Sequence, residues 1–240
     1  MFSTLKPSAM SLEEPFPSIR YIIFDCDGVL VDSEILASQT VLAMLRPYGF
    51  MMNKAEYGSR FSGKIEEDIL TIVQNEYGIA LPDSFLTEVR SAIERRLDSD
   101  LQPIAGMREV VESLSVPKAI VSNSRLRRVM ASLNTTHLSD LFSENLFAVD
   151  MVERPKPAPD IYLYAMQKLR ARPAECLVVE DSFSGVTAAY QAGAQVIGFS
   201  GASHVPAGHD KMLKQAGAQM ITADAGALRE LLDSMSLTIK

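Results

Sequence analysis

The 240-residue sequence has little of what several classes of protein depend on. It contains two cysteines and three histidines, too few for a disulfide framework or a Cys/His zinc module. Its apolar runs, such as residues 176–179, fall far short of the ~20 residues that span a bilayer. Its net charge of −7 argues against a nucleic-acid or anionic-membrane binder. We therefore expect a soluble, cytoplasmic protein whose partners include neither nucleic acid nor membrane.

What is present fits an ordinary globular chain. Hydrophobic residues make up 47% and charged residues 22% of the sequence, which excludes a disordered or fibrous protein. The first 18 residues hold three prolines, Glu13 and Glu14 but no apolar core, so they indicate a flexible tail rather than a secretory signal. We expect the folded part to begin at about Ile19.

Short apolar segments alternate with segments of helical periodicity from Ile19 onward. We expect strands at residues 21–24, 119–121, 147–149, 177–179, 196–199 and 220–222. Each is apolar on successive residues, which is typical of parallel strands buried on both faces. Helical patterns lie between them, for example from Gly106 onward and over residues 183–191. The sequence therefore predicts an α/β fold with a doubly wound, Rossmann-like parallel sheet.

The segment between the first two predicted strands breaks this alternation. Residues 33–102 contain no convincing strand, and roughly 70 residues are too many for an ordinary loop. Three helical patterns appear there, around residues 41–45, 65–73 and 85–97. We therefore expect a small helical domain at 33–102, inserted into a core formed by 19–32 and 103–240.

Polar side chains follow three of the predicted strands. They are Asp25 and Asp27 after the first strand, Ser122 and Asn123 after the second, and Glu180 and Asp181 after the fourth. The carboxyl ends of parallel strands lie along one edge of the sheet, where ligands bind, so these groups should converge. Four carboxylates in one cleft repel one another unless a cation is present, and oxygen ligands favour Mg²⁺.

These residues belong to four ordered motifs that resemble those of the haloacid dehalogenase superfamily. The motifs are residues 25–34 (DCDGVLVDSE), 121–123 (VSN), 154–157 (RPKP) and 179–182 (VEDS). Within the superfamily the chain looks most like sugar phosphatases and β-phosphoglucomutases. Residues 61–63 (FSG) and 97–99 (LDS) are similar to segments of 6-phosphogluconate phosphatases. The resemblance runs from about Ile19 to the C-terminus and implies that the helical insert is a cap.

The resemblance implies a phosphatase that works through an aspartyl-phosphate. Asp25 would be the nucleophile, and this covalent step would replace one difficult reaction by two easier ones. Asp27 would be the general acid and then the general base. Lys156 would neutralise the nucleophile and the phosphate. Ser122 and Asn123 would hold the phosphoryl oxygens.

The resemblance also implies Mg²⁺ as the cofactor. Asp25, the backbone carbonyl of Asp27, and Asp181 would bind the ion, with Glu180 binding it directly or through water. The charges of Mg²⁺ and Lys156 would balance the carboxylates of Asp25, Glu180 and Asp181. With Asp27 protonated, the site would then accept a phosphate dianion.

The cap is expected to select the substrate, because the core reads only the phosphoryl group. The expected substrate is a small phosphorylated metabolite, namely a sugar or sugar-acid phosphate. The candidate specificity residues in the cap are Arg60, Ser62, Gly63 and Lys64. Cys26 should pack in the interior, since it points away from its two aspartate neighbours on an extended chain. His204 and His209 are expected in a loop, and the chain is expected to be a monomer or a dimer.

Other functions stay open at the level of sequence. A phosphomutase is one alternative, although Ala37 and Glu66 stand where β-phosphoglucomutases have a histidine and an arginine. Lys64 or Arg60 could partly replace that arginine. A catalytically silent phosphate-binding module is another alternative, although each predicted catalytic position holds a competent residue.

Two further functions fit the sequence poorly. A dehalogenase would leave Asp27 and the neighbouring Glu180 and Asp181 without a role. A response-regulator receiver has neither a cap nor a second aspartate two residues after its phosphate acceptor.

Overall fold

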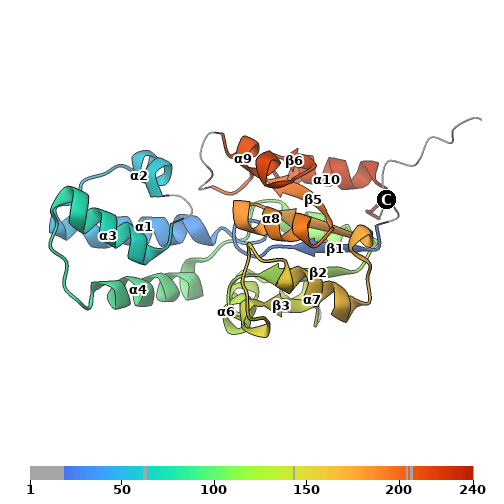
Figure 1. The fold of residues 1–240 in the computed structure, drawn as a ribbon, viewed down its shortest axis with the longest axis horizontal. Coiled ribbons are helices and arrows are strands. Elements are labelled where there is room, and N and C mark those ends of the chain that lie inside the picture. Colours follow the sequence, from blue (N-terminus) through green and yellow to red (C-terminus); the bar gives the residue numbers. More distant parts are fainter. Residues whose placement is uncertain (1–18, 62–63, 143, 204, 206–207, 240) are drawn as a thin grey trace, which may run out of the picture.

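The computed structural model describes residues 19–61, 64–142, 144–203, 205 and 208–239. The expected tail at 1–18, the cap residues Ser62 and Gly63, and His204 lie outside the described residues. Figure 1 shows a group of helices at one end of the molecule and a sheet with flanking helices at the other. Among the described helices, none has the length and apolarity needed to cross a bilayer.

Six parallel strands form one sheet in the order β3-β2-β1-β4-β5-β6. They are β1 (Tyr21–Phe24), β2 (Lys118–Ser122), β3 (Leu146–Ala148), β4 (Cys176–Glu180), β5 (Gln195–Phe199) and β6 (Met220–Thr222). This confirms the predicted doubly wound sheet. The expected bounds of β1 and β6 match the structure, whereas β2 and β4 extend one residue further at both ends and β5 begins one residue earlier. β3 begins and ends one residue earlier than expected, because Val149 already starts a 3₁₀ turn.

The strand order also locates the place where a ligand can bind. The chain builds outward from β1 to β3 and then returns to the other side of β1 with β4. Ligands of doubly wound sheets bind beyond the carboxyl ends of the strands at such a reversal. The residues that follow β1 and β4 therefore stand at the expected binding position.

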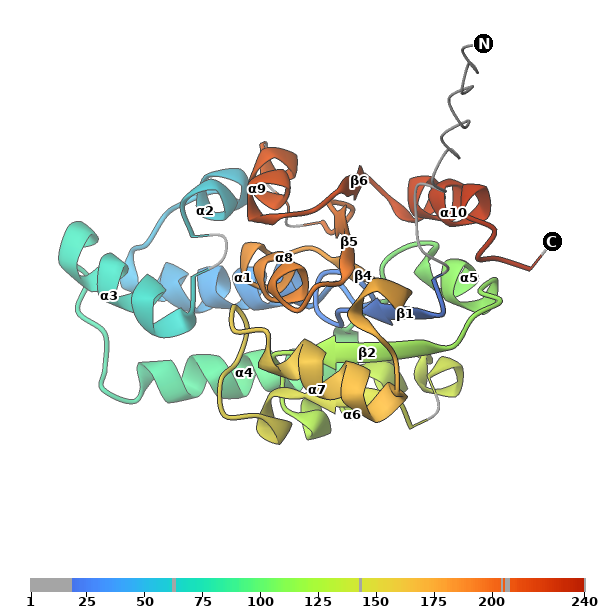
Figure 2. The same ribbon diagram turned by 45° about the vertical axis from the view of Figure 1, so that its right-hand side comes forward.

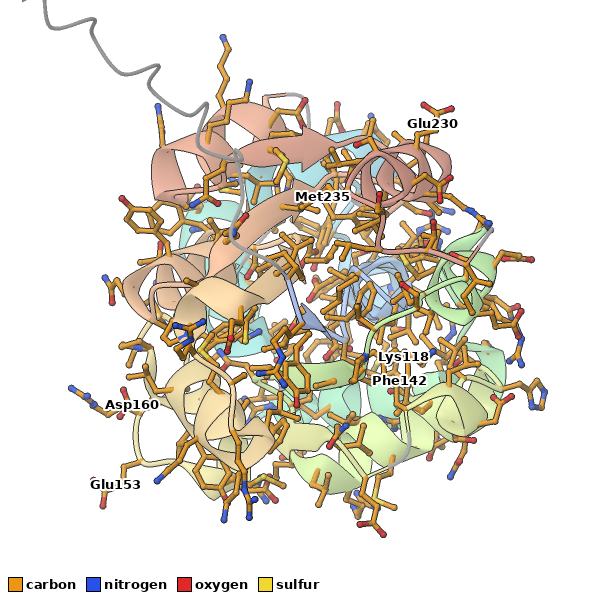
Figure 3. All side chains as sticks on the ribbon, turned by 90° about the vertical axis from the view of Figure 1, so that its right-hand side faces the viewer. Lys118, Phe142, Glu153, Asp160, Glu230 and Met235 are labelled. Carbon is orange, nitrogen blue, oxygen red and sulfur yellow. The ribbon has the colours of Figure 1, made fainter. Side chains whose placement is uncertain are left out.

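Helices cover both faces of the sheet (Figure 2). On one face lie α5 (Met107–Glu112), α6 (Leu126–Thr135) and α10 (Ala225–Ser234); on the other lie α7 (Asp160–Leu169), α8 (Phe183–Gln191) and α9 (His209–Ala216). Successive residues of a strand point to opposite faces, so Ile22 and Phe24 join one apolar cluster and Ile23 the other. Figure 3 shows Glu153 and Glu230 projecting from the rim, whereas Phe142 is buried.

Four helices lie between β1 and α5, in the segment where we expected the inserted domain. They are α1 (Ser33–Leu45), α2 (Lys54–Phe61), α3 (Glu66–Tyr77) and α4 (Phe85–Asp100), and they stand apart from the sheet in Figure 1. Only three had been expected, because α2 was missed. Ile65 was placed wrongly on the apolar face of α3, since it precedes that helix and is exposed. The predicted apolar face of α4 is buried along its length.

Short 3₁₀ helices complete the described chain. They are η1 (Arg46–Tyr48), η2 (Ser139–Leu141), η3 (Val149–Met151) and η4 (Pro173–Glu175). Between 33 and 102, the described residues contain no strand, as the sequence predicted.

Candidate active site

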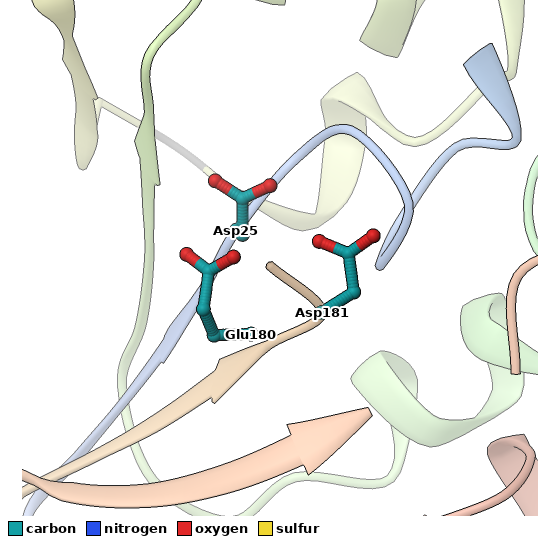
Figure 4. A group of neighbouring side chains, drawn as sticks. All are labelled: Asp25, Glu180 and Asp181. Carbon is teal, nitrogen blue, oxygen red and sulfur yellow. The ribbon is translucent and has the colours of Figure 1, made fainter. Parts of the chain in front are cut away.

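Three buried carboxylates meet where β1 and β4 end. Asp25 directly follows β1, Glu180 is the last residue of β4, and Asp181 follows it. Phe24 and Val179 are partners in the parallel pairing of these two strands, which brings the three residues side by side (Figure 4). Each residue offers an oxygen within 4.8 Å of the oxygens of the others. This all-oxygen donor set suits a hard cation such as Mg²⁺.

Two glycines make room for these carboxylates. A Cβ atom on Gly28 would lie 1.9 Å from Oδ2 of Asp181, and one on Gly185 would lie 1.9 Å from Cδ of Glu180. Gly28 also has a φ of +80°, a conformation that residues with a Cβ rarely adopt. In the sequence, Gly28 stood out only as part of the first motif at 25–34, and Gly185 was not singled out. Both glycines in fact shape the carboxylate cluster.

Lys156 lies between two of the carboxylates. Its Nζ donates to Asp25 Oδ1 at 2.6 Å, to Glu180 Oε2 at 2.7 Å and to the backbone oxygen of Val121 at 2.9 Å. Burial alone would lower the pKa of this ammonium, but the charges of Asp25 and Glu180 outweigh it and raise the pKa well above its ordinary value. Lys156 is therefore a permanent buried cation at the predicted nucleophile.

Asn123 positions the loop that carries this lysine. Its Oδ1 accepts from the backbone N–H of Lys156 at 2.9 Å, and its Nδ2 donates to the backbone oxygen of Lys156 at 3.2 Å. The neighbouring Ser122 is buried, and its Oγ accepts from the N–H of Ser124 at 2.9 Å. The side chain of Asn123 is thus engaged within the protein, and its main chain is what it can offer a phosphoryl oxygen.

The carboxylates strongly influence one another's protonation. Burial, followed by the charge of Glu180, raises the pKa of Asp25 to about 8. Burial and the charges of Glu180 and Asp25 raise the pKa of Asp181 well above its usual value. For Glu180, burial acts upward, but the charge and hydrogen bond of Lys156 and the hydrogen bonds from Ser182 prevail and hold its pKa low. Without a bound cation the cluster therefore holds protons.

Glu180 is surrounded by hydrogen-bond donors. Its Oε2 accepts from Lys156 and, at 2.9 Å, from the hydroxyl of Tyr162. Its Oε1 accepts from the backbone N–H of Ser182 at 3.1 Å and from the hydroxyl of the same residue at 2.8 Å. Both oxygens are held in place, so the geometry of Glu180 is set by the protein.

Asp27 stands apart from the carboxylate cluster and is held by two hydroxyls. Ser33 Oγ donates to its Oδ1 at 2.7 Å, and Ser124 Oγ donates to its Oδ2 at 2.8 Å. Ser33 begins α1 and Ser124 follows β2, so the two donors come from different parts of the chain. The sequence argument named neither donor, although Ser33 lies in its first motif and Ser124 directly follows its second.

Of the residues singled out in this segment of the sequence, Arg60 contacts other residues of the helical insert, Lys64 is exposed, and Ser62 and Gly63 lie outside the described residues. Arg60 forms an ion pair with Glu76 inside the cap and lies 5.8 Å and 5.7 Å from the ring centres of Phe61 and Tyr77. Lys64 is exposed at the end of the undescribed segment 62–63. The structure therefore joins the predicted core residues but does not join Arg60 to them.

Two smaller expectations have clear outcomes. Cys26 is buried in the apolar cluster, as predicted. The loop position expected for His209 was wrong, because this residue begins α9. A nitrogen of its ring lies 2.5 Å from the backbone oxygen of Asp181, so it contacts the segment that carries a cluster carboxylate.

The fold and the site together define an α/β enzyme with a charged site at the switch point of its sheet. Residues 22–199 match the family model described as haloacid dehalogenase-like hydrolase. The chain is 30% identical over 187 residues to 6-phosphogluconate phosphatase of Escherichia coli K12, covering 78% of this chain and 85% of that protein. The chain therefore belongs to the haloacid dehalogenase-like hydrolase family.

Solved structures agree with this assignment. A haloacid dehalogenase-like protein of unknown function from Agrobacterium tumefaciens C58 has a TM-score of 0.85 at 36% identity, covering 91% of this chain and 100% of that one. A hydrolase of the family from Deinococcus radiodurans R1, with bound phosphate and sodium, has a TM-score of 0.83 at 28% identity, covering 92% and 97%. The expected superfamily is confirmed, and within it the chain is a phosphatase.

Proposed function

We propose that this phosphatase depends on Mg²⁺ and hydrolyses the phosphomonoester of a small sugar or sugar acid through an aspartyl-phosphate on Asp25. The main support is the placement of Lys156 at 2.6 Å from Asp25, with the carboxylate of Asp27 held separately by two serine hydroxyls. The 6-phosphogluconate phosphatase from E. coli supports the substrate class. The two buried free cysteines of the present chain fit a cytoplasmic enzyme.

The side chains divide the reaction between them. A carboxylate oxygen of Asp25 attacks phosphorus, and the bond from phosphorus to the leaving oxygen breaks. Asp27 gives its proton to that oxygen and afterwards takes a proton from the water that attacks the aspartyl-phosphate. Such proton transfer typically contributes ~10²–10⁴-fold in rate. Lys156 stays protonated and offsets negative charge at Asp25 and on the phosphoryl oxygens.

The residues present fit a magnesium ion. Asp25, Asp181 and the backbone oxygen of Asp27 would hold it, with Glu180 directly or through water. Gly28 leaves the space that brings Asp181 close to the loop after β1. When bound, Mg²⁺ supplies positive charge that lets the carboxylates stay ionised beside a phosphate dianion.

We propose that helices α1–α4 act as the cap that selects the substrate. Glu66, three residues after Gly63 in the sequence, begins α3 and carries a negative charge, which disfavours a second phosphate on the substrate. Ala37, in α1, provides no acid or base. Both features favour hydrolysis over phosphoryl transfer between two positions of a sugar, so the phosphomutase is the second candidate.

Inorganic phosphate release from a panel of sugar and sugar-acid phosphates tests the proposal, with Mg²⁺ or with EDTA. We expect metal-dependent release that Asp27→Asn lowers at least ~10²-fold, the lower range for general acid–base catalysis. Asp25→Asn should fold normally and form no covalent phosphoenzyme. Unimpaired turnover by Asp25→Asn would remove Asp25 as the nucleophile. No release from any substrate by folded wild-type protein would favour the mutase or a silent binding module.

A further inference from the structure

Tyr162 is a fully buried tyrosine whose hydroxyl donates to Glu180 in the carboxylate cluster. It is the third residue of α7, and its side chain packs with Ile161, Ala165 and Met166 in the apolar cluster that α7 forms with the sheet. Its relative exposure is 0%. A buried tyrosine hydroxyl needs a hydrogen-bond partner, and here that partner is Glu180.

The same side chain contacts both members of an ion pair. Its hydroxyl donates to Glu180 Oε2 at 2.9 Å, the oxygen that Lys156 Nζ approaches to 2.7 Å. Lys156 Nζ lies over the ring of Tyr162, 5.0 Å from the ring centre, within the range of a cation–π contact. Tyr162 therefore fixes the carboxylate by a hydrogen bond and borders the ammonium with its ring.

We propose that Tyr162 is a positioning residue, which holds Glu180 so that Lys156 remains shared between Glu180 and Asp25. This role rests on the proposed function. Lys156 Nζ has three acceptors. Its distance from Asp25 depends on how strongly Glu180 attracts it, and other hydrogen bonds to Glu180 weaken that attraction. Without the hydroxyl, Oε2 keeps Lys156 as its remaining side-chain donor and draws the ammonium away from Asp25.

The replacement Tyr162→Phe isolates the hydroxyl, because phenylalanine keeps the ring and its volume. Tyr164→Phe is the matched control, since Tyr164 lies two residues further along α7 and packs against Phe147 rather than the site. Each variant is compared with wild type in two measurements. One is calorimetric binding of Mg²⁺ alone to substrate-free protein, and the other is kcat and KM for phosphate release.

We expect Tyr162→Phe to change Mg²⁺ affinity about fivefold and to lower kcat about tenfold, with KM changed by less than about twofold, the scale of one ordinary intramolecular hydrogen bond. Tyr164→Phe should match wild type. If Tyr162→Phe leaves both Mg²⁺ affinity and kcat within twofold of wild type, the hydroxyl is only a satisfied core group and the proposal is wrong. The binding experiment needs no turnover, so it can fail or succeed independently of the proposed function.

A double-mutant cycle with Glu180→Gln tests whether Tyr162 acts through Glu180. If it does, Tyr162→Phe should change Mg²⁺ affinity by less than twofold once Glu180 has been replaced. Equal effects of Tyr162→Phe in both backgrounds would contradict the proposal.

Discussion

The backbone approaches the carboxylate of Asp181 closely at Gly28, in the loop after β1. This residue has a φ of +80°, and a Cβ there would lie 1.9 Å from Asp181 Oδ2. The chain also contains a glycine of similar backbone conformation in open space, since Gly49 has a φ of +87° and no atom within 4 Å of a Cβ. Comparing alanine substitutions at Gly28 and Gly49 separates the effect of backbone strain from the effect of the steric contact with Asp181.

We predict that Gly28→Ala weakens Mg²⁺ binding at least tenfold and abolishes most turnover, because Asp181 must move. Gly49→Ala carries the same conformational strain, of order 1 kcal/mol, and should leave Mg²⁺ binding unchanged. Mg²⁺ titrations of the two folded variants check this. Equal affinities in both variants would show that the close contact with Asp181 does not shape the metal site.

The two hydroxyls on Asp27 give a second prediction for single residues. Ser124→Ala removes the donor to Asp27 Oδ2 and leaves the donor from Ser33 in place. We expect kcat to fall about tenfold, since the carboxylate loses part of its orientation, while Mg²⁺ affinity stays within twofold. Ser91→Ala, on the exposed side of α4, is the control. A drop in Mg²⁺ affinity that parallels the drop in kcat would mean that Ser124 supports the metal site instead.

Among the elements, α4 of the helical insert contacts α6 beside the sheet through the side chain of Arg128 and through a hydrogen bond from the hydroxyl of Thr135 to the backbone oxygen of Asp98. Arg128 Nη1 donates to Glu94 at 3.0 Å and to Asp98 at 2.7 Å, and the arginine side chain is only 13% exposed. Arg90 offers a contrast, because it pairs with Glu67 inside the cap and is 49% exposed. An exposed pair contributes ~0–1 kcal/mol, and the burial of Arg128 places its bridge toward the upper end.

We predict that Arg128→Met lowers the melting temperature by about 2–4 °C, the shift that ~1 kcal/mol produces in a protein of this size. Arg90→Met should change it by less than about 1 °C, because that pair is screened by solvent. Thermal denaturation at low and at high salt checks the result, and the difference between the variants should shrink in high salt. A larger loss in Arg90→Met would exclude the cross-domain bridge as the stabilising contact.

The elements also show what a single sequence can and cannot predict. All six strands were predicted because each is a short apolar run, and α4 because its apolar residues recur every four positions. The helix α2 was missed because only Tyr57 and Phe61 of its eight residues are buried and Gly58 interrupts the pattern. A weak periodicity of this kind is decided by packing, which sequence alone does not reveal.

In the site, too, some features could be predicted from the sequence and others are set by packing. The proximity of Asp25 and Asp181 could be predicted because both follow strands of a parallel sheet. That of Lys156 could be predicted because it belongs to one of the four ordered motifs. The hydroxyl of Tyr162 and its contact with Glu180 could not, because Tyr162 reads as one more apolar position of α7. Ser124 lies 97 residues from the aspartate that it holds, and only the strand order brings them together.

At the scale of the whole molecule, the buried carboxylates link stability to pH and to metal. The pKa of Asp25 is raised from 3.8 to about 8, and that of Asp181 is raised as well. Between about pH 4 and pH 8 the folded protein therefore holds protons that the unfolded chain releases. The stability that Asp25 contributes is fully present below pH 4 and is lost as the pH rises toward 8, and the raised pKa of Asp181 acts in the same direction. The lowered pKa of Glu180 affects stability only at acidic pH, where this carboxylate becomes protonated.

A divalent cation should reverse this loss, because it replaces the protons on the cluster. We predict that Mg²⁺ at a hundred times its pH 8 dissociation constant raises the melting temperature by about 5–10 °C at pH 8. The same Mg²⁺ concentration should raise the melting temperature less at pH 6. At pH 6, protons compete for the same oxygens and the gain is smaller. Asp181→Asn should remove most of the gain at pH 8, and melting curves in Mg²⁺ and in EDTA at both pH values measure it. A gain of equal size at both pH values in the wild-type protein would show that the ion binds elsewhere, because binding at Asp25 and Asp181 must displace their protons.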